Sequence, residues 1–400
     1  MDSDVLVEYA PDRRLGMGGY AVVWRATEQK SGRAVVIKKI LDAFTNDTDA
    51  QRVFREIMYQ RAANHPSLLK LISLWRAANN KDVYMILPCM DTDLSQALRA
   101  GMVTKAVQRQ FILFQLLCAL KYLHSHVLVH RDIKPMNLLL NLDCELVVCD
   151  FGLIRSLGSA NGENLAATDQ VGSRWYRAPE IMLGCTQYGV SVDMWSVGCV
   201  MAELMTGKIM LPGSSNSNQL QRIFEVTGMP TPADLEEINS AEAAEILDMV
   251  PRNITQKNLA KLVPRTPELA LDLLRQLLKL RASERADTAA ALSHPYLAAF
   301  IHADDKRRIF MEESAAATDP DSSPQFRTPI KDSIRYPSSV YRDYLYKHVI
   351  ENKAGPAPTS PSSPSPPVCV PGLAISQISA GAAAPPFSPP PDFDEDAMAA

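Results

Sequence analysis

The pattern of apolar and polar residues divides the chain into a long patterned part and a tail. Residues 5–300 carry periodic apolar patterning, which is typical of a folded core. From Ser314 onward Pro, Ser, Ala and Asp dominate, and residues 356–391 contain dense runs of Pro and Ser. Because such a composition buries too little apolar surface to offset the entropy lost on ordering, we expect residues 354–400 to form a disordered tail.

A short apolar pattern returns ahead of this tail. Tyr341–Asn352 places Tyr341, Leu345 and Val349 four residues apart, on one face of a helix. This spacing predicts a short amphipathic helix within a C-terminal extension that covers residues 301–353.

The two ends of the patterned part differ in their predicted elements. The first ninety residues are rich in short β-branched segments, whereas helical periodicity prevails from residue 92 onward. We therefore predict an α+β fold with two lobes, a small β-rich N-lobe that ends near residue 88 and a larger α-helical C-lobe that starts near residue 91. The predicted strands are Tyr20–Thr27, Ala34–Ile40, Leu68–Trp75 and Asp82–Leu87, and the predicted helices include Gln51–Ala63, Ala106–His124 and Asp193–Thr206.

Composition and charge exclude several classes of protein. The chain has 400 residues, 46% hydrophobic and 22% charged, which is the composition of a globular protein. Its formal net charge of −4 offers no basic surplus for nucleic acid or an anionic membrane, and no stretch approaches the roughly 18 apolar residues of a membrane span. The seven cysteines are odd in number and lack Cys-x-x-Cys spacing, which indicates reduced thiols in a protein of the cytoplasm, the nucleus or both.

Candidate chemistry begins with a glycine-rich turn. The segment Leu15-Gly-Met-Gly-Gly-Tyr-Ala-Val-Val23 joins two strand-like segments, and residues without side chains let backbone N–H groups close over phosphate oxygens. Taken alone it also fits an ordinary hairpin, since Ala21 replaces the third glycine of G-x-G-x-x-G. A dinucleotide-binding turn is disfavoured because a strand follows, where that motif has a helix.

A lysine inside an apolar strand supports a phosphate site. Lys38 ends the run Val35-Val-Ile-Lys38, where a lone ammonium group is costly unless it is paired. Glu56 on the following helix is an available partner, and a lysine held by a glutamate can bridge the α- and β-phosphates of a nucleotide. Lys39 is the second candidate for the phosphate-binding lysine. The alternative to a phosphate site is that the lysine and Glu56 are two charges that simply face solvent.

The most specific segment is His130-Arg-Asp-Ile-Lys-Pro-Met-Asn137. Its chemistry assigns Asp132 as the base that accepts a substrate hydroxyl proton and Lys134 as the cation that neutralises charge on the transferred phosphoryl group. Asn137, and Asp150 of Asp150-Phe-Gly152, supply oxygen ligands for Mg²⁺. Ala178-Pro-Glu180 closes the segment that follows, with Arg285 as the expected partner of Glu180.

These motifs, in this order, resemble the protein kinase superfamily over about residues 9–300. Further segments resemble the mitogen-activated protein kinases, among them Arg174–Glu180, Val192–Cys199 and Leu211–Leu220. The Pro-rich tail and the helix ahead of it are similar to the atypical extracellular-signal-regulated branch, the mitogen-activated protein kinase fifteen type. A cyclin-dependent-like or male-germ-cell-kinase-like enzyme remains an alternative.

The resemblance implies a bilobal Ser/Thr kinase that uses ATP and Mg²⁺ and phosphorylates proteins at Ser/Thr-Pro sites, including its own, as a monomer. It implies that Met90 N–H and Pro88 C=O contact adenine, that Asp93 meets the ribose, and that Leu87 is the gatekeeper. Catalytic roles fall to Lys38, Glu56, Asp132 and Lys134. The implied nucleotide-binding residues are Leu15, Gly16, Met17, Gly18, Gly19, Tyr20, Ala21, Val22, Val23, Val36, Lys38, Pro88, Met90, Asp93 and Leu139.

Three residues depart from the family pattern. Thr168-Asp-Gln170 lacks the tyrosine of the family's Thr-x-Tyr activation motif. Val36 stands where alanine is usual and narrows the adenine slot, and Gln60 stands where an apolar residue normally stacks towards Phe151. A buried amide without a partner costs about 1–3 kcal/mol, so a catalytically weak pseudokinase that binds partners through its tail is the rival to an active enzyme.

Regulation is expected at the remaining phosphorylatable residue of that motif. Phosphorylation of Thr168 would add about −1.5 to −2 charge, and Arg55, Arg131 and Arg155 are placed by motif to meet it. We therefore expect activation by phosphate at Thr168 alone.

Overall fold

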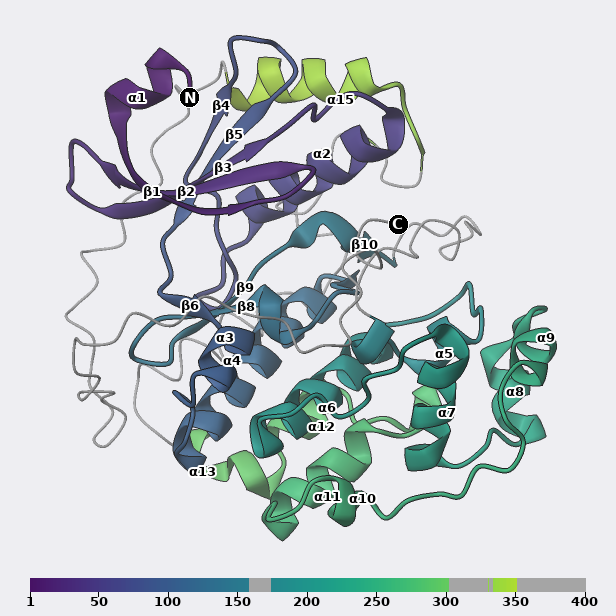
Figure 1. Ribbon diagram of the computed structural model, residues 1–400. Helices are drawn as coiled ribbons and strands as arrows, with labels where there is room; N and C mark the ends of the chain where they lie inside the picture. Colours follow the sequence, from purple (N-terminus) through teal and green to yellow (C-terminus); the bar gives the residue numbers. More distant parts are fainter. Residues whose placement is uncertain (158–173, 302–329, 331–333, 351–400) are drawn as a thin grey trace.

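A computed structural model describes residues 1–157, 174–301, 330 and 334–350, and it has two lobes (Figure 1). The expected tail, residues 354–400, lies outside the described residues, as does most of the extension that precedes the C-terminal helix. The α+β fold with a β-rich N-lobe and a helical C-lobe is confirmed. Among the described residues, no helix is long and apolar enough to cross a lipid bilayer.

The N-lobe is a five-stranded antiparallel sheet with the strand order β1-β2-β3-β5-β4. Short α1 (Ser3–Glu8) covers one face, and the longer α2 lies along the other side of the lobe (Figure 1). The bounds are β1 (Tyr9–Met17), β2 (Ala21–Glu28), β3 (Ala34–Ile40), α2 (Asp47–Ala62), β4 (Ser73–Arg76) and β5 (Val83–Pro88).

Strand β3 shows why this sheet has two apolar faces. Val35 and Ile37 are fully buried in one cluster with Val5 and Tyr9 of the N-terminal segment. The alternate residues Val36 and Ile40 lie in a second cluster, which contains residues of α2. Because side chains alternate along a strand, Lys38 must share the face that looks towards α2.

One predicted strand is wrong over most of its length. Leu68–Trp75 was expected to be a strand, but β4 contains only Ser73–Arg76. The preceding residues leave the sheet and approach the C-lobe, where the Leu69 N–H donates to the Val148 carbonyl at 2.9 Å. An apolar run of this kind fits a strand and a buried crossing segment equally well.

The C-lobe is built on two buried helices, α4 (Ala106–Ser125) and α6 (Ser191–Thr206). Short strands beneath the N-lobe carry the catalytic segments: β6 (Thr92–Asp93), β7 (Leu128–Val129), β8 (Leu138–Leu140), β9 (Leu146–Val148) and β10 (Arg155–Ser156). Among these lie the 3-10 turns η1 (Pro135–Asn137) and η2 (Phe151–Leu153). The other described elements are α3 (Leu94–Arg99), η3 (Arg174–Tyr176), α5 (Pro179–Met182), α7 (Asn216–Thr227), α8 (Pro232–Ile238), α9 (Ala243–Asp248), α10 (Leu259–Leu262), α11 (Glu268–Leu277), η4 (Ala282–Glu284), α12 (Thr288–Leu292), η5 (Pro295–Leu297) and α13 (Ala298–Ile301).

The expected ion pair between Glu180 and Arg285 is present and bidentate. Arg285 Nη1 and Nη2 each donate to one Glu180 oxygen at 2.6 Å, and the arginine side chain is fully buried. Arg285 also donates to the carbonyls of Lys279, Leu280 and Ser191. These bonds satisfy the buried charge, so the pair fixes the end of the activation segment to the C-terminal helices.

The predicted C-terminal helix returns to the N-lobe. It consists of α15 (Ser338–Leu345) and a π-helical turn, η7 (Tyr346–Ile350), and therefore starts three residues earlier than expected. Tyr341 and Leu345 are buried as the pattern predicts, and the Tyr341 ring centroid lies 5.3 Å from that of Phe54 in α2. Figure 1 shows α15 alongside α2, so two segments almost 300 residues apart in sequence form one packed layer.

Helix α2 carries one buried group without a partner. Gln60 is 1% exposed, and its side-chain Oε1 has no hydrogen bond to any described residue. Gln51, on the same helix, is also buried, but its Nε2 donates to the Ile334 carbonyl at 3.2 Å.

We predict that Gln60→Leu stabilises the protein, because it removes a buried acceptor that folding leaves unsatisfied. The expected gain is about 1–3 kcal/mol, or roughly 2–5 °C in melting temperature. The matched control is Gln51→Leu, which breaks a hydrogen bond and should lower the melting temperature. Differential scanning calorimetry on both variants checks this, and an equal loss in both would contradict it.

Candidate active site

A buried carboxylate holds the backbone of the catalytic segment. Asp193, at the start of α6, accepts hydrogen bonds from the backbone N–H of His130 at 2.9 Å and of Arg131 at 2.8 Å. Its Oδ2 also lies 2.9 Å from His124 Nε2. Arg131 is thereby held at φ +71°, a left-handed conformation that costs about 1–3 kcal/mol outside glycine. No motif in the sequence predicts this role of Asp193, although an aspartate within the apolar run Val192–Cys199 indicates a buried carboxylate with hydrogen-bond partners.

Asp132 follows this strained residue and lies among donors. Its Oδ2 accepts from Lys134 Nζ at 2.9 Å and from Asn137 Nδ2 at 2.8 Å. Burial raises the pKa of Asp132, while Lys134 pulls the pKa in the opposite direction without cancelling the rise. The structure thus brings together the three residues that the sequence analysis assigned to base, charge neutralisation and metal binding.

Asn137 and Asp150 are placed on adjacent strand ends. The Cys149 N–H donates to the Asn137 carbonyl at 2.9 Å, which fixes the two oxygen donors relative to each other. Both Asn137 Nδ2 bonds go to Asp132, so the amide oxygen is left to face a cation. Asp150 has φ 64° and ψ 77°, and the adjacent Phe151 is fully buried, with its ring against that of His130.

Lys38 and Lys39 point to opposite faces of β3. Lys38 Nζ lies 2.5 Å from Glu56 Oε1 on α2, whereas Lys39 Nζ lies 2.8 Å from Asp82 Oδ2. Burial by itself lowers the pKa of Lys38, but Glu56 and Asp150 outweigh it and the net shift is upward. Lys38 is therefore the charged lysine between the two lobes, and Lys39 serves the opposite face.

The glycine-rich turn is exposed to solvent and leaves open space around its backbone. Residues 10–20 are exposed, with Met17 at 69% and Tyr20 at 74%, and the turn closes through the Gly18 N–H on the Ala21 carbonyl at 2.9 Å. A Cβ atom added at Gly16, Gly18 or Gly19 would meet no atom within 4 Å, and none of these glycines has a positive φ. Neither packing nor backbone conformation requires glycine here, so the open space suits a phosphate chain.

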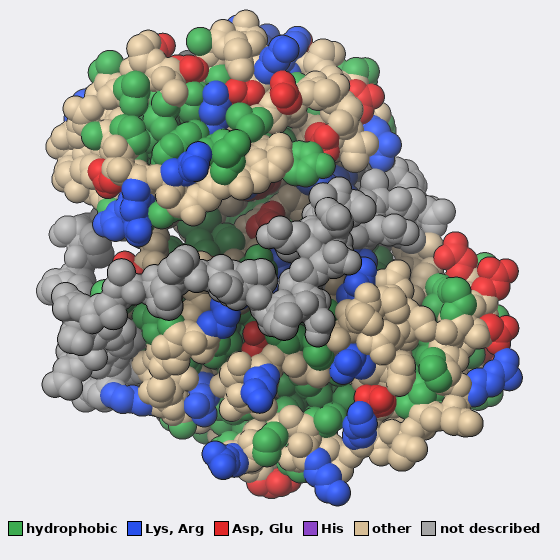
Figure 2. Space-filling model, in the orientation of Figure 1, with side chains coloured by type: hydrophobic (Ala, Val, Ile, Leu, Met, Phe, Trp, Pro, Cys, Tyr) green, Lys and Arg blue, Asp and Glu red, His purple; other side chains and the backbone are tan. Residues whose placement is uncertain are grey.

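The expected adenine slot lies between β3, β5 and β8. Val36 and Leu139 belong to one apolar cluster with Leu87, and Val36 is the register partner of Leu87. Val23 is the register partner of Lys38, and Pro88 and Met90 are half-buried at the connection between the lobes. Figure 2 shows the hollow between the lobes on one side of the molecule, with acidic side chains inside it.

Asp93 has a local role as well as its expected one. It is the N-cap of α3: its Oδ1 accepts from the Gln96 N–H at 2.9 Å and its Oδ2 from Gln96 Nε2 at 2.5 Å. A carboxylate can accept about four hydrogen bonds, so contact with a ribose remains compatible with the cap.

The three candidate regulatory arginines belong to segments that lie near η2. Arg131 Nη1 donates to the Leu153 carbonyl at 3.4 Å. In the strand pair β10–β7, Arg155 lies opposite Val129, one residue before His130. Arg55 is buried on α2, which packs against η2. Thr168 and Gln170 lie outside the described residues, so their contacts stay a prediction.

The donor set fits ATP and Mg²⁺. Two side-chain oxygens, from Asn137 and Asp150, leave room for phosphate and water ligands, which is how Mg²⁺ is commonly held. The cation Lys38 and the open glycine turn suit the phosphates.

Comparison with known proteins gives the same answer. The protein kinase domain family matches residues 9–297. Extracellular signal-regulated kinase 2 of Dictyostelium discoideum is 40% identical over 375 residues, which cover 92% of this chain and 98% of that protein. Mitogen-activated protein kinase 15 of Xenopus laevis is 40% identical over 88% of this chain and 58% of its own length. Mitogen-activated protein kinase 2 of Arabidopsis thaliana is 39% identical over 74% of this chain and 78% of its own.

The two-lobed fold, the hydrogen bonds that hold Asp132 and these relatives all point to one family. The chain belongs to the protein kinase family and, within it, to the mitogen-activated protein kinases, so it is a Ser/Thr protein kinase that uses ATP and Mg²⁺.

Proposed function

We propose that this kinase is proline-directed and transfers the γ-phosphoryl group of ATP to Ser/Thr-Pro sites of proteins. The observation that carries the catalytic part is Asp132, whose carboxylate lies between Lys134 and Asn137 on a fixed backbone. Proline direction is supported by the resemblance to the mitogen-activated protein kinases. We further propose a monomer in the cytoplasm or nucleus, with neither nucleic acid nor membrane as partner.

In the proposed mechanism, each side chain acts at one place. Asp132 orients the substrate hydroxyl and accepts its proton, and Lys134 offsets charge on the transferred phosphoryl group. Lys38, held by Glu56, binds the α- and β-phosphates. Asn137 and Asp150 would hold Mg²⁺, which when bound offsets the charge of the phosphate oxygens.

Adenine would lie between Val23 and Val36 above and Leu139 below, with backbone contacts from Pro88 and Met90. The proposed kinase domain covers residues 9–300, followed by the extension 301–353 and the tail 354–400. The Ser/Thr-Pro sites that follow the proposed kinase domain make self-phosphorylation part of the proposal, and they are Ser323, Thr328, Ser360, Ser363, Ser365 and Ser388.

A weakly active scaffold is the second candidate, and one observation favours it. The unpartnered Gln60 amide on α2 lowers the stability of the helix that carries Glu56. Phosphorylation of Thr168 would compensate by adding charge-assisted bonds to Arg55, Arg131 and Arg155, each worth about 1.5–3 kcal/mol.

The first of three predictions on the proposed function tests specificity and the base. A peptide with Ser-Pro should be phosphorylated with kcat/KM roughly 10-fold or more above the same peptide with Ser-Ala, as one side chain in a pocket can discriminate. Asp132→Asn should lose about 10²–10⁴-fold in kcat while nucleotide affinity stays nearly unchanged, since the carboxylate acts on the hydroxyl. Equal rates on both peptides would refute proline direction, and more than a tenth of the wild-type turnover in Asp132→Asn would refute the base.

The second prediction concerns pH. Burial raises the pKa of Asp132, so its carboxyl group becomes protonated at a higher pH than an ordinary aspartate does. As the pH is lowered, kcat/KM should therefore begin to fall at a pH above the usual aspartate range. Lys134 lowers that pKa, so Lys134→Met should move the acid limb further upward. Lys39→Met is the control, since its partner is Asp82. An acid limb that stays put or moves downward in Lys134→Met would contradict the assignment.

The third prediction concerns activation. Thr168→Ala should lower kcat at least roughly tenfold. The variant loses the two or three charge-assisted bonds that would otherwise outweigh the cost of about 1–3 kcal/mol from the unsatisfied Gln60 amide. Mass spectrometry of the active wild-type protein should find phosphate at Thr168. Full activity of the variant, together with an unmodified Thr168 in the wild type, would rule out the switch.

A further inference from the structure

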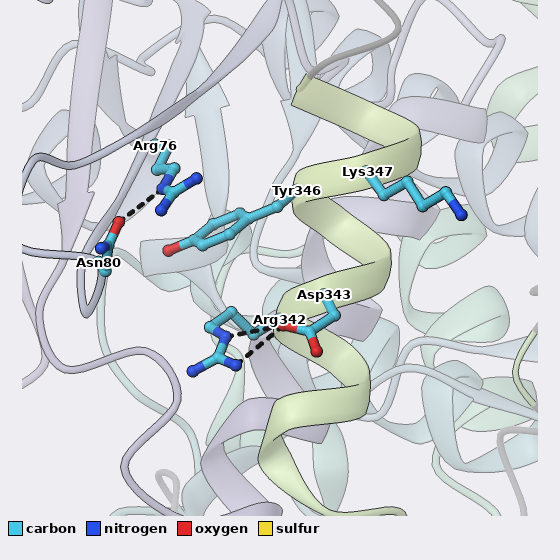
Figure 3. Close-up of a pocket in the computed structure, with 6 residues that line it drawn as sticks. All are labelled: Arg76, Asn80, Arg342, Asp343, Tyr346 and Lys347. Atoms are coloured by element: carbon cyan, nitrogen blue, oxygen red, sulfur yellow. Dashed lines mark hydrogen bonds and ion pairs between the residues drawn. The ribbon is translucent and has the colours of Figure 1, made fainter.

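The C-terminal helix and the N-lobe line an open, polar hollow away from the catalytic segment. It lies where α15 and η7 meet the turn between β4 and β5, and its volume is about 590 Å³ (Figure 3). One lining residue ends β4, one lies in the turn that follows it, two belong to α15 and two to η7: Arg76, Asn80, Arg342, Asp343, Tyr346 and Lys347.

Tyr346 projects into this hollow with an unsatisfied hydroxyl. The residue is 7% exposed, and its hydroxyl is buried without a hydrogen bond to any described residue. Figure 3 shows the phenol pointing between the side chains of Arg76 and Arg342. Burial raises the pKa of Tyr346, so the group stays an O–H donor at neutral pH.

The charges around this hydroxyl are mainly positive. The Arg76 guanidinium carbon lies 4.7 Å from the Tyr346 ring centroid, and its Nε donates to Asn80 Oδ1 at 2.6 Å. This leaves both Arg76 Nη groups without a hydrogen bond to the described residues. Arg342 is paired with its neighbour Asp343 at 2.9 Å, and Lys347 has no ion pair in the described part of the chain. Three cations and one carboxylate therefore line the hollow.

We propose that Arg76, Arg342 and Tyr346 form an oxyanion site that binds a phosphoserine of the chain's own Ser-Pro segment, Ser360–Pro366. Two guanidinium groups and a neutral phenol are all donors, and a phosphate monoester has three strong acceptor oxygens. This inference rests on the proposed function, since a proline-directed kinase is what would phosphorylate such a segment.

The chain's own segment is favoured by its covalent connection. Ser360 follows Ile350, the last described residue, by ten positions, and ten residues span at most about 33–36 Å. A covalent connection of this length can give an effective concentration of the order of millimolar. A phosphopeptide from another molecule has no such advantage.

Occupation of this site would reach the catalytic residues through α2. A phosphate held by both Arg76 and Arg342 would tie the sheet turn to α15, whose Tyr341 and Leu345 are buried in the same cluster as Phe54 and Ile57 of α2. Helix α2 carries Glu56, the partner of Lys38. The site would therefore stabilise the position of the phosphate-binding ion pair.

The test is a binding assay with the full, phosphatase-treated chain and no ATP, so its outcome does not depend on substrate specificity. The probe is a fluorescent peptide of residues 354–367, phosphorylated at Ser360, Ser363 and Ser365, and anisotropy measures its affinity. It should bind at least roughly tenfold more tightly than the unphosphorylated peptide, and Arg76→Ala or Arg342→Ala should each lose about tenfold. The control Arg33→Ala removes another exposed N-lobe arginine, which pairs with Glu28, and should leave binding unchanged.

Tyr346→Phe distinguishes a ligand from a merely buried group. If the hydroxyl donates to phosphate, the variant should bind the phosphopeptide about 2–10-fold more weakly while its melting temperature stays equal or rises. Unchanged affinity in Tyr346→Phe would overturn the hydroxyl's role, and equal binding of the two peptide forms would overturn the site. A scrambled phosphopeptide that binds as well would show a generic phosphate contact and overturn the assignment to Ser360–Pro366.

Discussion

The active site depends on the carboxylate of Asp193. It is buried completely, yet it accepts from two consecutive backbone N–H groups and contacts an imidazole. Burial alone raises the pKa of Asp193, but the hydrogen bond and charge of His124 and the backbone bond outweigh it and lower the pKa. The ionised group keeps Arg131 in its left-handed conformation, which is the conformation that presents Asp132. Without that anchor the strain at Arg131 would relax, and the Asp132 carboxylate that we propose as the base would lose its position.

A second constraint joins the lobes through α2. Lys38 belongs to the sheet, Glu56 to the helix, and Asp150 contributes to the charge that keeps Lys38 protonated. The three groups lie on separate elements, so their meeting depends on where α2 lies. The helix packs on η2 on one side and on α15 on the other. The C-terminal helix is therefore part of the catalytic architecture, although it follows the kinase domain in sequence.

Much of this arrangement could be predicted from local pattern. The bounds of β3 match the prediction at both ends, and α4 differs by one residue, because both have long apolar periodicity and clear turn residues. The choice of Lys38 over Lys39 also followed from strand alternation. The prediction of a strand over Leu68–Trp75 was wrong because an apolar run indicates that a segment is buried but not which element it packs against. The role of Asp193 was missed for the same reason: its partners are backbone groups 62 and 63 positions earlier, and no local pattern encodes them.

The remaining departure, Gln60, is best understood together with α15. A buried acceptor without a hydrogen bond weakens the packing of α2, while Phe54, Tyr341 and Tyr344 form an aromatic group that strengthens it. Aromatic contacts contribute about 0.5–1.5 kcal/mol each beyond burial, which is the same order as the cost of the amide. Both terms act on the helix that carries Glu56, so a change on either of them bears on the Lys38–Glu56 ion pair. The charge-assisted bonds that we propose for a phosphate at Thr168 are of the same order as these two terms, so phosphorylation there would act on the seating of α2 on a comparable scale.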